Sequence, residues 1–260
     1  MDLAGRVAFV TGGGSGMGRA AARRLTDEGM KVCVADINGA TAAAVADEIG
    51  GMAITLDVGD FDAMDAAMSA CVSRFGGLDL AYLNAGIAGG GTIQTFDPAA
   101  YERMLGVNQN GVIYSAACAV KHMRNRPDGS SSGAIVATSS IAGIDPFGPD
   151  PFYTLTKHAV VGFIRAIGMS LAPERISAHV ICPAMTDTGL LGPGTKERML
   201  EAGRDVLAPE AIANAVVLAA SSPLDASGTC WVVQYGKPPY PFEFSHVEGH
   251  VSFGTIQPRR

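Results

Sequence analysis

The chain has 260 residues, of which 48% are hydrophobic and 17% are charged, and its net charge is −6. This balance provides enough apolar material for a large folded core and excludes an intrinsically disordered chain. An acidic chain without long runs of Lys or Arg is not expected to bind nucleic acid, because neutralising phosphates requires a basic surface.

Targeting, cysteine and histidine patterns bear on location and metal chemistry. The first residues lack the basic and apolar regions of a signal peptide, and no apolar run reaches the roughly 20 residues of a membrane span. We therefore expect a soluble cytoplasmic protein. The five cysteines are scattered, which predicts buried reduced thiols. His246 and His250 do not form the H-E-x-x-H zinc pattern, so we expect a solvated tail and no metal.

Short apolar runs alternate with segments of helical periodicity along most of the chain. We expect strands over residues 6–10, 31–36, 53–57, 79–83, 134–139, 176–181 and 229–234. We expect helices over residues 18–29, 40–49, 61–75, 98–124, 152–171 and 209–220. This alternation predicts an α/β fold of Rossmann type, with a doubly wound, seven-stranded parallel sheet and helices on both faces.

We expect this sheet to form a single domain over residues 1–235, because no shift in composition marks an internal boundary. Residues 236–260 begin with a proline-rich segment that cannot form a regular helix or an inner strand. They are predicted to form a C-terminal arm or tail. The aromatic side chains of Tyr240, Phe242 and Phe244 favour an arm that packs on a neighbour.

A glycine-rich segment, Thr11-Gly-Gly-Gly-Ser-Gly-Met-Gly18, connects the first strand to the first helix. Glycines allow the backbone to approach a pyrophosphate, and the helix N-terminus offers free N–H groups. Asp36 ends the next strand, where its carboxylate can bind ribose hydroxyls and repel a 2′-phosphate. Ile37 follows it, with no Lys or Arg nearby in sequence, so NAD is favoured over NADP. Alternatively, Asp36 only caps the following helix.

Further polar residues follow the third, fourth and fifth strands. Asp57 closes the third strand, where it could accept the adenine amino group, and Asn84 follows the fourth. Tyr153 and Lys157 are one helical turn apart, and Ser140 lies at the end of the strand before that helix. A phenol with a pKa near 10 is a poor base at neutral pH, and a neighbouring ammonium lowers that pKa.

These motifs, in this order, resemble the short-chain dehydrogenases/reductases over about residues 4–235. The matching segments are Thr11–Gly18, Asp57-Val58, Asn84-Ala85-Gly86, Val107-Asn108-x-x-Gly111, Ser139-Ser140, Tyr153-x-x-x-Lys157 and Pro183 to Thr188. Residues 153–191 and 208–236 are also similar to 15-hydroxyprostaglandin dehydrogenases. One departure is Pro183-Ala184, where the family usually has Pro-Gly, and alanine would restrict a positive φ.

The resemblance implies roles for individual residues. Tyr153 would be the general acid/base, Lys157 would hold the nicotinamide ribose, and Ser140 would bind the reacting oxygen. Asn108 would hold a water that relays the proton, and Thr188 would contact the carboxamide. The complete set of expected cofactor contacts is Gly12, Gly14, Ser15, Gly16, Met17, Gly18, Asp36, Ile37, Asp57, Val58, Asn84, Ala85, Gly86, Tyr153, Lys157, Pro183, Thr186 and Thr188.

The residues and the resemblance together predict an NAD-dependent enzyme that transfers a hydride to or from a secondary alcohol or ketone. Apolar residues flank the predicted site and suit a hydrophobic substrate, although they would equally serve ordinary packing: Phe147, Phe152, Met185, Leu190 and Leu191. Surplus apolar surface on helices 98–124 and 152–171 predicts a homotetramer or homodimer. The alternatives are an NADPH-dependent carbonyl reductase and a catalytically idle nucleotide sensor on the same fold.

Overall fold

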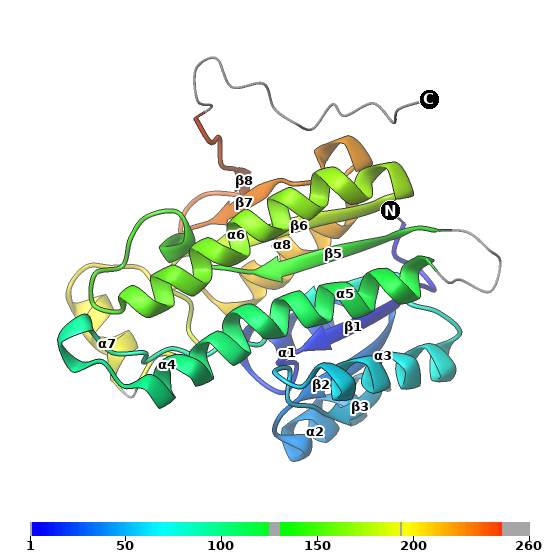
Figure 1. Ribbon diagram of the computed structural model, residues 1–260, viewed down its shortest axis with the longest axis horizontal. Helices are drawn as coiled ribbons and strands as arrows, with labels where there is room; N and C mark the ends of the chain where they lie inside the picture. Colours follow the sequence, from blue (N-terminus) through cyan, green and yellow to red (C-terminus); the bar gives the residue numbers. More distant parts are fainter. Residues whose placement is uncertain (1, 125–130, 193, 246–260) are drawn as a thin grey trace.

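The computed structural model describes residues 2–124, 131–192 and 194–245 (Figure 1). Within this part, one sheet has the strand order β3-β2-β1-β4-β5-β6-β7-β8. The strands are β1 (Val7–Thr11), β2 (Lys31–Asp36), β3 (Met52–Thr55), β4 (Leu80–Leu83), β5 (Gly133–Thr138), β6 (Ile176–Pro183), β7 (Cys230–Val233) and β8 (Tyr240–Pro241). Strands β1 to β7 are parallel, which confirms the doubly wound sheet.

The strand order reverses at β1, which pairs with β2 on one side and with β4 on the other. Chain connections leave β1 and β4 in opposite directions there, so a crevice opens at the carboxyl ends of these strands. The glycine-rich segment follows β1 directly. The sheet topology therefore places it at the one point of the fold where ligands of open α/β sheets bind.

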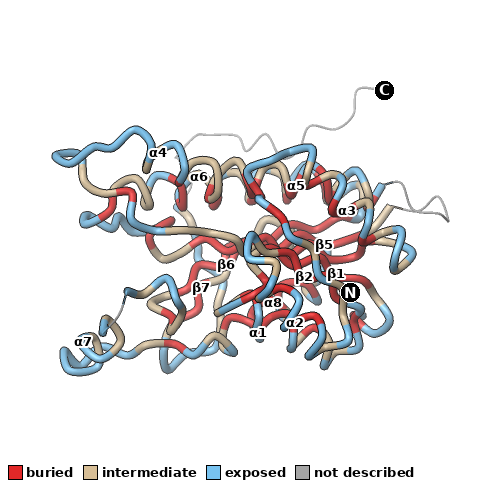
Figure 2. The backbone as a smooth tube through the Cα atoms, turned by 90° about the horizontal axis from the view of Figure 1, so that it is seen from below, coloured by how far each residue is buried: buried red, intermediate tan, exposed pale blue. Residues whose placement is uncertain are grey.

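The strands are apolar on both faces because helices cover both sides (Figure 2). Phe9 belongs to one core cluster, whereas its neighbours Ala8 and Val10 belong to the other. The first cluster includes side chains of α3 (Phe61–Phe75), α5 (Gly111–Arg124) and α6 (Pro151–Leu171). The second includes side chains of α1 (Gly16–Asp27), α2 (Gly39–Ile49) and α8 (Pro209–Ser221). The burial of both strand faces is what makes these strands continuously hydrophobic.

The helix predicted over residues 98–124 is interrupted. The structure has α4 (Pro98–Leu105), a π-helical turn over Gly106–Asn110, and then α5. Such a turn inserts a residue and changes the direction of a side chain, and here Asn108 becomes fully buried. A further short helix, α7 (Thr195–Glu201), lies in a segment for which no helix was predicted.

The sheet also contains one strand more than predicted. The short strand β8 pairs antiparallel with β7 at the sheet edge, where prolines are tolerated. Beyond it, Phe244 packs against the core cluster of this same chain, and the Arg165 guanidinium lies 3.6 Å from its ring centre. The described part of the arm therefore packs on its own sheet. His246 and His250 lie outside the described residues.

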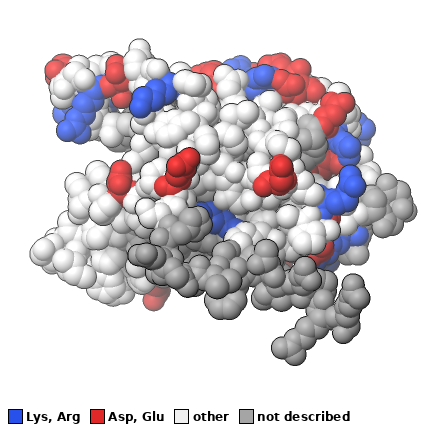
Figure 3. All heavy atoms as spheres, turned by 90° about the horizontal axis from the view of Figure 1, so that it is seen from above, with Lys and Arg blue, Asp and Glu red and all other residues white. Residues whose placement is uncertain are grey.

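The distribution of surface charge and the state of the cysteines agree with the expectations from composition. On the face shown in Figure 3, Lys and Arg side chains intermix with Asp and Glu, and a large part of the surface carries no charge. All five cysteines are buried and free, as predicted. Within the described residues, no helix is both long and apolar enough to cross a membrane.

Candidate active site

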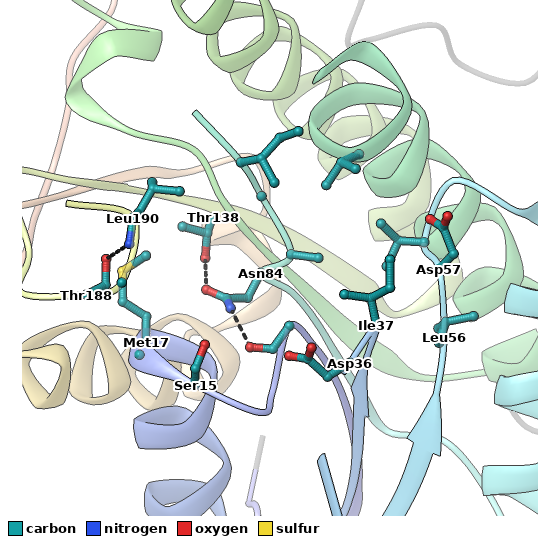
Figure 4. Close-up of a pocket in the computed structure, with 18 of the residues that line it drawn as sticks. Ser15, Met17, Asp36, Ile37, Leu56, Asp57, Asn84, Thr138, Thr188 and Leu190 are labelled. Carbon is teal, nitrogen blue, oxygen red and sulfur yellow. Dashed lines mark hydrogen bonds between the residues drawn. The ribbon is translucent and has the colours of Figure 1, made fainter. Parts of the chain in front are cut away.

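A cavity of about 590 Å³ opens at the carboxyl ends of the central strands. Its walls come from the segments that follow β1 to β6, and Figure 4 shows side chains from several of them facing one space. The predicted site residues that line it are Gly12, Ser15, Gly16, Met17, Asp36, Ile37, Asp57, Val58, Asn84, Ala85, Gly86, Tyr153, Lys157 and Thr188. The fold thus gathers into one cavity residues that are far apart in the sequence.

The glycine-rich segment turns tightly between β1 and α1. Gly12 and Gly16 have positive φ values of 61° and 48°. A Cβ atom on Gly18 would lie 2.0 Å from the Gly12 carbonyl oxygen, so no larger residue fits there without displacing the backbone. Ser15 precedes α1 without capping it through its side chain, which leaves first-turn N–H groups of α1 available. This cradle fits a dinucleotide pyrophosphate.

Asp36 ends β2 at the wall of the cavity. Its Oδ2 accepts a hydrogen bond of 2.9 Å from the Gly14 N–H, and its Oδ1 accepts one of 2.9 Å from the Asn38 N–H. The cap of α2 is instead Asn38, whose side chain accepts hydrogen bonds from the N–H groups of Ala40 and Thr41. The interpretation of Asp36 as a simple helix cap is therefore wrong.

A polar network joins the carboxyl ends of β1, β4 and β5 beneath the cavity. Asn84 accepts at Oδ1 from the Thr138 hydroxyl at 3.3 Å (Figure 4). The same Oδ1 accepts from the Tyr82 hydroxyl at 3.1 Å, and Nδ2 donates to the Gly12 carbonyl at 3.3 Å. The Thr11 hydroxyl accepts from the N–H of Asn84 at 2.9 Å. These bonds satisfy buried polar groups and hold the glycine-rich segment in register with β4.

Asn108 holds the loop after β4 from the side of the π-helical turn. Its Oδ1 accepts from the Ile87 N–H at 2.8 Å, and its Nδ2 donates to the Ile87 carbonyl at 2.9 Å. Nδ2 also donates to the Thr156 hydroxyl at 3.2 Å, one residue before Lys157 on α6. Both ends of the Asn108 amide are thus used to join this loop to α6.

The N-terminal half of α6 brings the predicted catalytic pair to the cavity. Lys157 is 3% exposed, and its ammonium nitrogen lies 5.4 Å from the centre of the Tyr153 ring. The ammonium donates to the Thr138 carbonyl at 3.2 Å. Ser140 follows β5, and its Oγ accepts from the Ala142 N–H at 3.1 Å. The structure therefore brings Tyr153, Lys157 and Ser140 together, as expected.

Burial controls the ionisation of this pair. It raises the pKa of Tyr153 to about 12, while hydrogen bonding by the Ser140 side chain acts in the opposite direction. Burial lowers the pKa of Lys157 to about 8. The sequence predicts that the ammonium makes the phenol more acidic, but burial has the larger effect on the pKa of Tyr153. Tyr153 is accordingly protonated at neutral pH and is placed to donate a proton.

Six of the predicted residues lie outside the cavity wall: Gly14, Gly18, Asn108, Ser140, Pro183 and Thr186. Ser140 nevertheless interacts with Tyr153, and the Thr186 hydroxyl donates to the Ala184 carbonyl at 2.9 Å. Ala184 itself is unstrained, since Arg175 is the only described residue other than glycine with a positive φ. The departure from Pro-Gly is therefore accommodated.

The cavity also contains residues that the sequence patterns did not single out: Leu56, Ile87, Arg103, Thr138 and Gly189. Several directly adjoin predicted residues, so extending each motif by one position would have found them. Arg103 is different, because it lies on the exposed surface of α4 and belongs to no motif. Only the tertiary structure brings it to the cavity.

Comparisons with known proteins agree with this geometry. A profile described as short chain dehydrogenase matches residues 6–198. The chain is 35% identical over 191 residues to a 3beta-hydroxysteroid dehydrogenase of Mediterraneibacter gnavus, covering 71% of this chain and 67% of that protein. It is 32% identical over 209 residues to (+)-borneol dehydrogenase 1 of Salvia officinalis, covering 77% of each.

A solved structure shows the same similarity. The 3-ketoacyl-(acyl-carrier-protein) reductase from Brucella melitensis, complexed with NADH, superimposes with a TM-score of 0.83 at 30% identity. The match covers 90% of this chain and 98% of that one. The profile match spans well over half of the sequence, and its relatives oxidise or reduce alcohol and ketone groups. The chain therefore belongs to the short-chain dehydrogenase family.

Proposed function

We propose that this protein is an NAD(H)-dependent oxidoreductase that interconverts a secondary alcohol and its ketone. The observation that carries the proposal is the position of Tyr153 and Lys157, which line the same cavity as the glycine-rich cradle and Asp36. A phenol and an ammonium at the end of a nucleotide cleft are the groups that proton transfer beside a nicotinamide requires.

Each residue of the site has its own role in this reaction. A bound nicotinamide supplies the hydride acceptor or donor. The substrate oxygen lies between Ser140 and Tyr153, and Tyr153 donates its proton to a ketone oxygen or accepts one from an alcohol. Lys157 orients the adjacent ribose and places a positive charge beside the phenol. Asn108 uses its side chain to hold Ile87 and Thr156, so a relay water at this residue would use its main-chain carbonyl.

Two features bear on the choice between NAD and NADP. The Asp36 carboxylate, held by the Gly14 and Asn38 N–H groups, accepts ribose hydroxyls and repels a 2′-phosphate, which supports NAD. Arg103 also lines the cavity, and a guanidinium is a good phosphate ligand, which supports the second candidate, an NADPH-dependent carbonyl reductase. Fluorescence titrations with NADH and NADPH distinguish the two. Tighter binding of NADPH would reject the first candidate.

The substrate that we propose is apolar. Large apolar side chains are exposed in the loops that follow β4, β5 and β6: Ile93, Phe96, Phe147 and Leu190. Of the residues expected in an apolar pocket, Phe152 instead packs against Phe96 and Tyr101, with ring centres 5.5 and 5.4 Å away. Exposed apolar groups beside a cavity favour binding of a hydrophobic partner or ligand. The hydroxysteroid and borneol relatives support the same substrate class.

A catalytically idle nucleotide sensor would need no intact proton-transfer group. Tyr153, Lys157 and Ser140 are all present and interact, which favours an active enzyme over a sensor.

We further propose a cytoplasmic homotetramer or homodimer that associates through α5 and α6, with residues 1–235 as its catalytic domain. Light scattering after size-exclusion chromatography tests the assembly, and a monomer at micromolar concentration would contradict it.

One experiment tests the reaction. The purified chain is incubated with NAD⁺ or NADP⁺ and a panel of secondary alcohols, hydroxysteroids, monoterpenols and sugars, and reduced nicotinamide is followed by absorbance. We expect turnover with NAD⁺ and apolar secondary alcohols and the reverse reaction with NADH and the matching ketones. Binding of NADH without turnover of any substrate in either direction would favour the sensor.

A further inference from the structure

Asp150 is a buried carboxylate beside the candidate active site that belongs to none of the predicted motifs. It is 7% exposed and caps α6, accepting a hydrogen bond of 2.9 Å at Oδ1 from the Tyr153 N–H. Its Oδ2 accepts two more, each of 3.0 Å, from the N–H groups of Gly89 and Gly90. One carboxylate therefore joins the start of the catalytic helix to the loop after β4.

That loop needs an external support. Gly89, Gly90 and Gly91 follow one another, and two of them have positive φ values, of 91° and 83°. Consecutive glycines lose more conformational freedom on ordering than other residues do, so the loop is not expected to hold one conformation by itself. Asn108 binds the loop at Ile87, and Asp150 binds it at Gly89. These two buried side chains hold the loop from the π-helical turn and from the start of α6, respectively.

The loop in turn shapes the catalytic site. Asn84, Ala85, Gly86 and Ile87 line the cavity, and a Cβ atom on Gly86 would lie 3.4 Å from the Lys157 ammonium nitrogen. A displaced loop would therefore enter the space around Lys157. The N-cap of α6 at the same time sets the direction in which the first turn presents Tyr153.

We propose that Asp150 is a positioning residue for the reaction. Its carboxylate fixes the position of the first turn of α6 relative to the loop that lies beside Lys157. This inference rests on the proposed function. Hydrogen bonds to an ionised acceptor are stronger than neutral ones, and all three donors here are backbone groups with few alternative partners. The carboxylate also places a negative charge near Tyr153, and that charge raises the pKa of the phenol. The other groups acting on the phenol are Ser140 and the Cys182 thiol, with the Lys157 ammonium above its ring.

Asp150→Asn keeps one of the three functions of this side chain, the helix cap, and removes the other two. Asparagine is a good N-cap, so its oxygen can still accept from the Tyr153 N–H. Its amino group then faces the Gly89 and Gly90 N–H groups, which are donors as well, so the loop loses its acceptor. The negative charge disappears. Asp150→Ser is a second variant. Its hydroxyl can still cap α6, but the shorter side chain cannot reach the N–H groups of Gly89 and Gly90. Asp60→Asn is the matched control, because Asp60 caps α3 at an exposed position through one hydrogen bond to the Ala63 N–H.

We expect Asp150→Asn to bind NADH within about threefold of wild type and to lose kcat by roughly tenfold or more, since small displacements of reacting groups are costly. The midpoint of the pH profile for alcohol oxidation shifts to lower pH, because removal of the negative charge makes Tyr153 easier to ionise. Asp60→Asn changes neither quantity. A reduced thermal stability with unchanged kcat and an unchanged midpoint would overturn the proposal and leave Asp150 as an ordinary cap.

A measurement without substrate separates this proposal from the proposed function. Hydrogen–deuterium exchange of residues 86–91 is compared between the wild type, Asp150→Asn, Asp150→Ser and Asp60→Asn. We expect roughly tenfold faster exchange in Asp150→Asn and Asp150→Ser than in the wild type, and no change in Asp60→Asn. Faster exchange in a protein that turns over no alcohol or ketone would reject the proposed function but keep the loop attachment. Unchanged exchange would refute the attachment whatever the activity.

Discussion

The ammonium nitrogen of Lys157 lies 5.4 Å from the centre of the Tyr153 ring, and the lysine is almost completely buried. The ammonium has a hydrogen bond to the Thr138 carbonyl, and burial lowers its pKa to about 8 while the pKa of Tyr153 rises to about 12. Burial thus favours the neutral form of both groups, but at neutral pH only Tyr153 is uncharged, while Lys157 remains mostly protonated.

Removing the phenol oxygen should abolish proton transfer without disturbing the fold. We predict that Tyr153→Phe lowers kcat by roughly 10²- to 10⁴-fold, the range typical of a positioned acid or base. NADH affinity, measured by fluorescence titration, should stay within about threefold. Tyr235→Phe is the control, because Tyr235 is 61% exposed and lies beyond β7. Wild-type turnover in Tyr153→Phe would contradict the assignment of this residue.

The buried lysine should make stability depend on pH. The pKa of Lys157 is lowered from 10.5 to about 8 by folding, so between these values the unfolded chain binds more protons and stability rises with pH. The difference in unfolding free energy between the wild type and Lys157→Met should therefore increase by about 2 kcal/mol from about pH 7.5 to about pH 10. Urea denaturation of the ligand-free proteins measures this difference. The other titrating groups are the same in both proteins, so their contributions to this difference largely cancel. A difference that does not change with pH would mean that Lys157 keeps an ordinary pKa.

Asp36 should determine the choice of cofactor. Asp36→Asn removes the charge that repels a 2′-phosphate while keeping the size of the side chain. We predict that the ratio of NADH to NADPH affinity falls by roughly tenfold or more, as expected for the loss of an interaction with a charged group. Fluorescence titration with both dinucleotides measures it. Asp47→Asn on the exposed face of α2 is the control. An unchanged ratio would assign the preference to another residue, with Arg103 the first to examine.

The cradle should tolerate no side chain at Gly18. In Gly18→Ala the new Cβ would lie 2.0 Å from the Gly12 carbonyl oxygen and 2.8 Å from the Asn84 side-chain nitrogen. We predict that NADH binding is lost and that the unfolding free energy falls by about 1–3 kcal/mol, because both neighbours must move. Gly50→Ala provides the comparison. Gly50 has a positive φ of 64° but nothing within 4 Å of a Cβ, so stability should fall by about 1 kcal/mol while NADH still binds.

Most helices and the parallel strands were predictable because each one has a local signal. Residues 61–75 were predicted as a helix and form α3, which Asp60 caps and Gly76 ends. The helix over residues 98–124 was predicted as continuous, since its periodicity continues through Gly106–Asn110. Within the π-helical turn found there, Asn108 contacts Ile87, which is 21 residues away. No pattern within the helix encodes that contact.

The sequence by itself determined the sheet with its glycine-rich cradle and the pairing of Tyr153 with Lys157. Hydrophobic periodicity, glycine and helical spacing act over a few residues and are visible along the chain. Only the tertiary structure decided the ionisation of that pair, the presence of Arg103 in the cavity and the attachment of Gly89 to Asp150, 61 residues away. Burial and contacts between distant segments arise only when the helices pack on the sheet, and these interactions have no fixed spacing in the sequence.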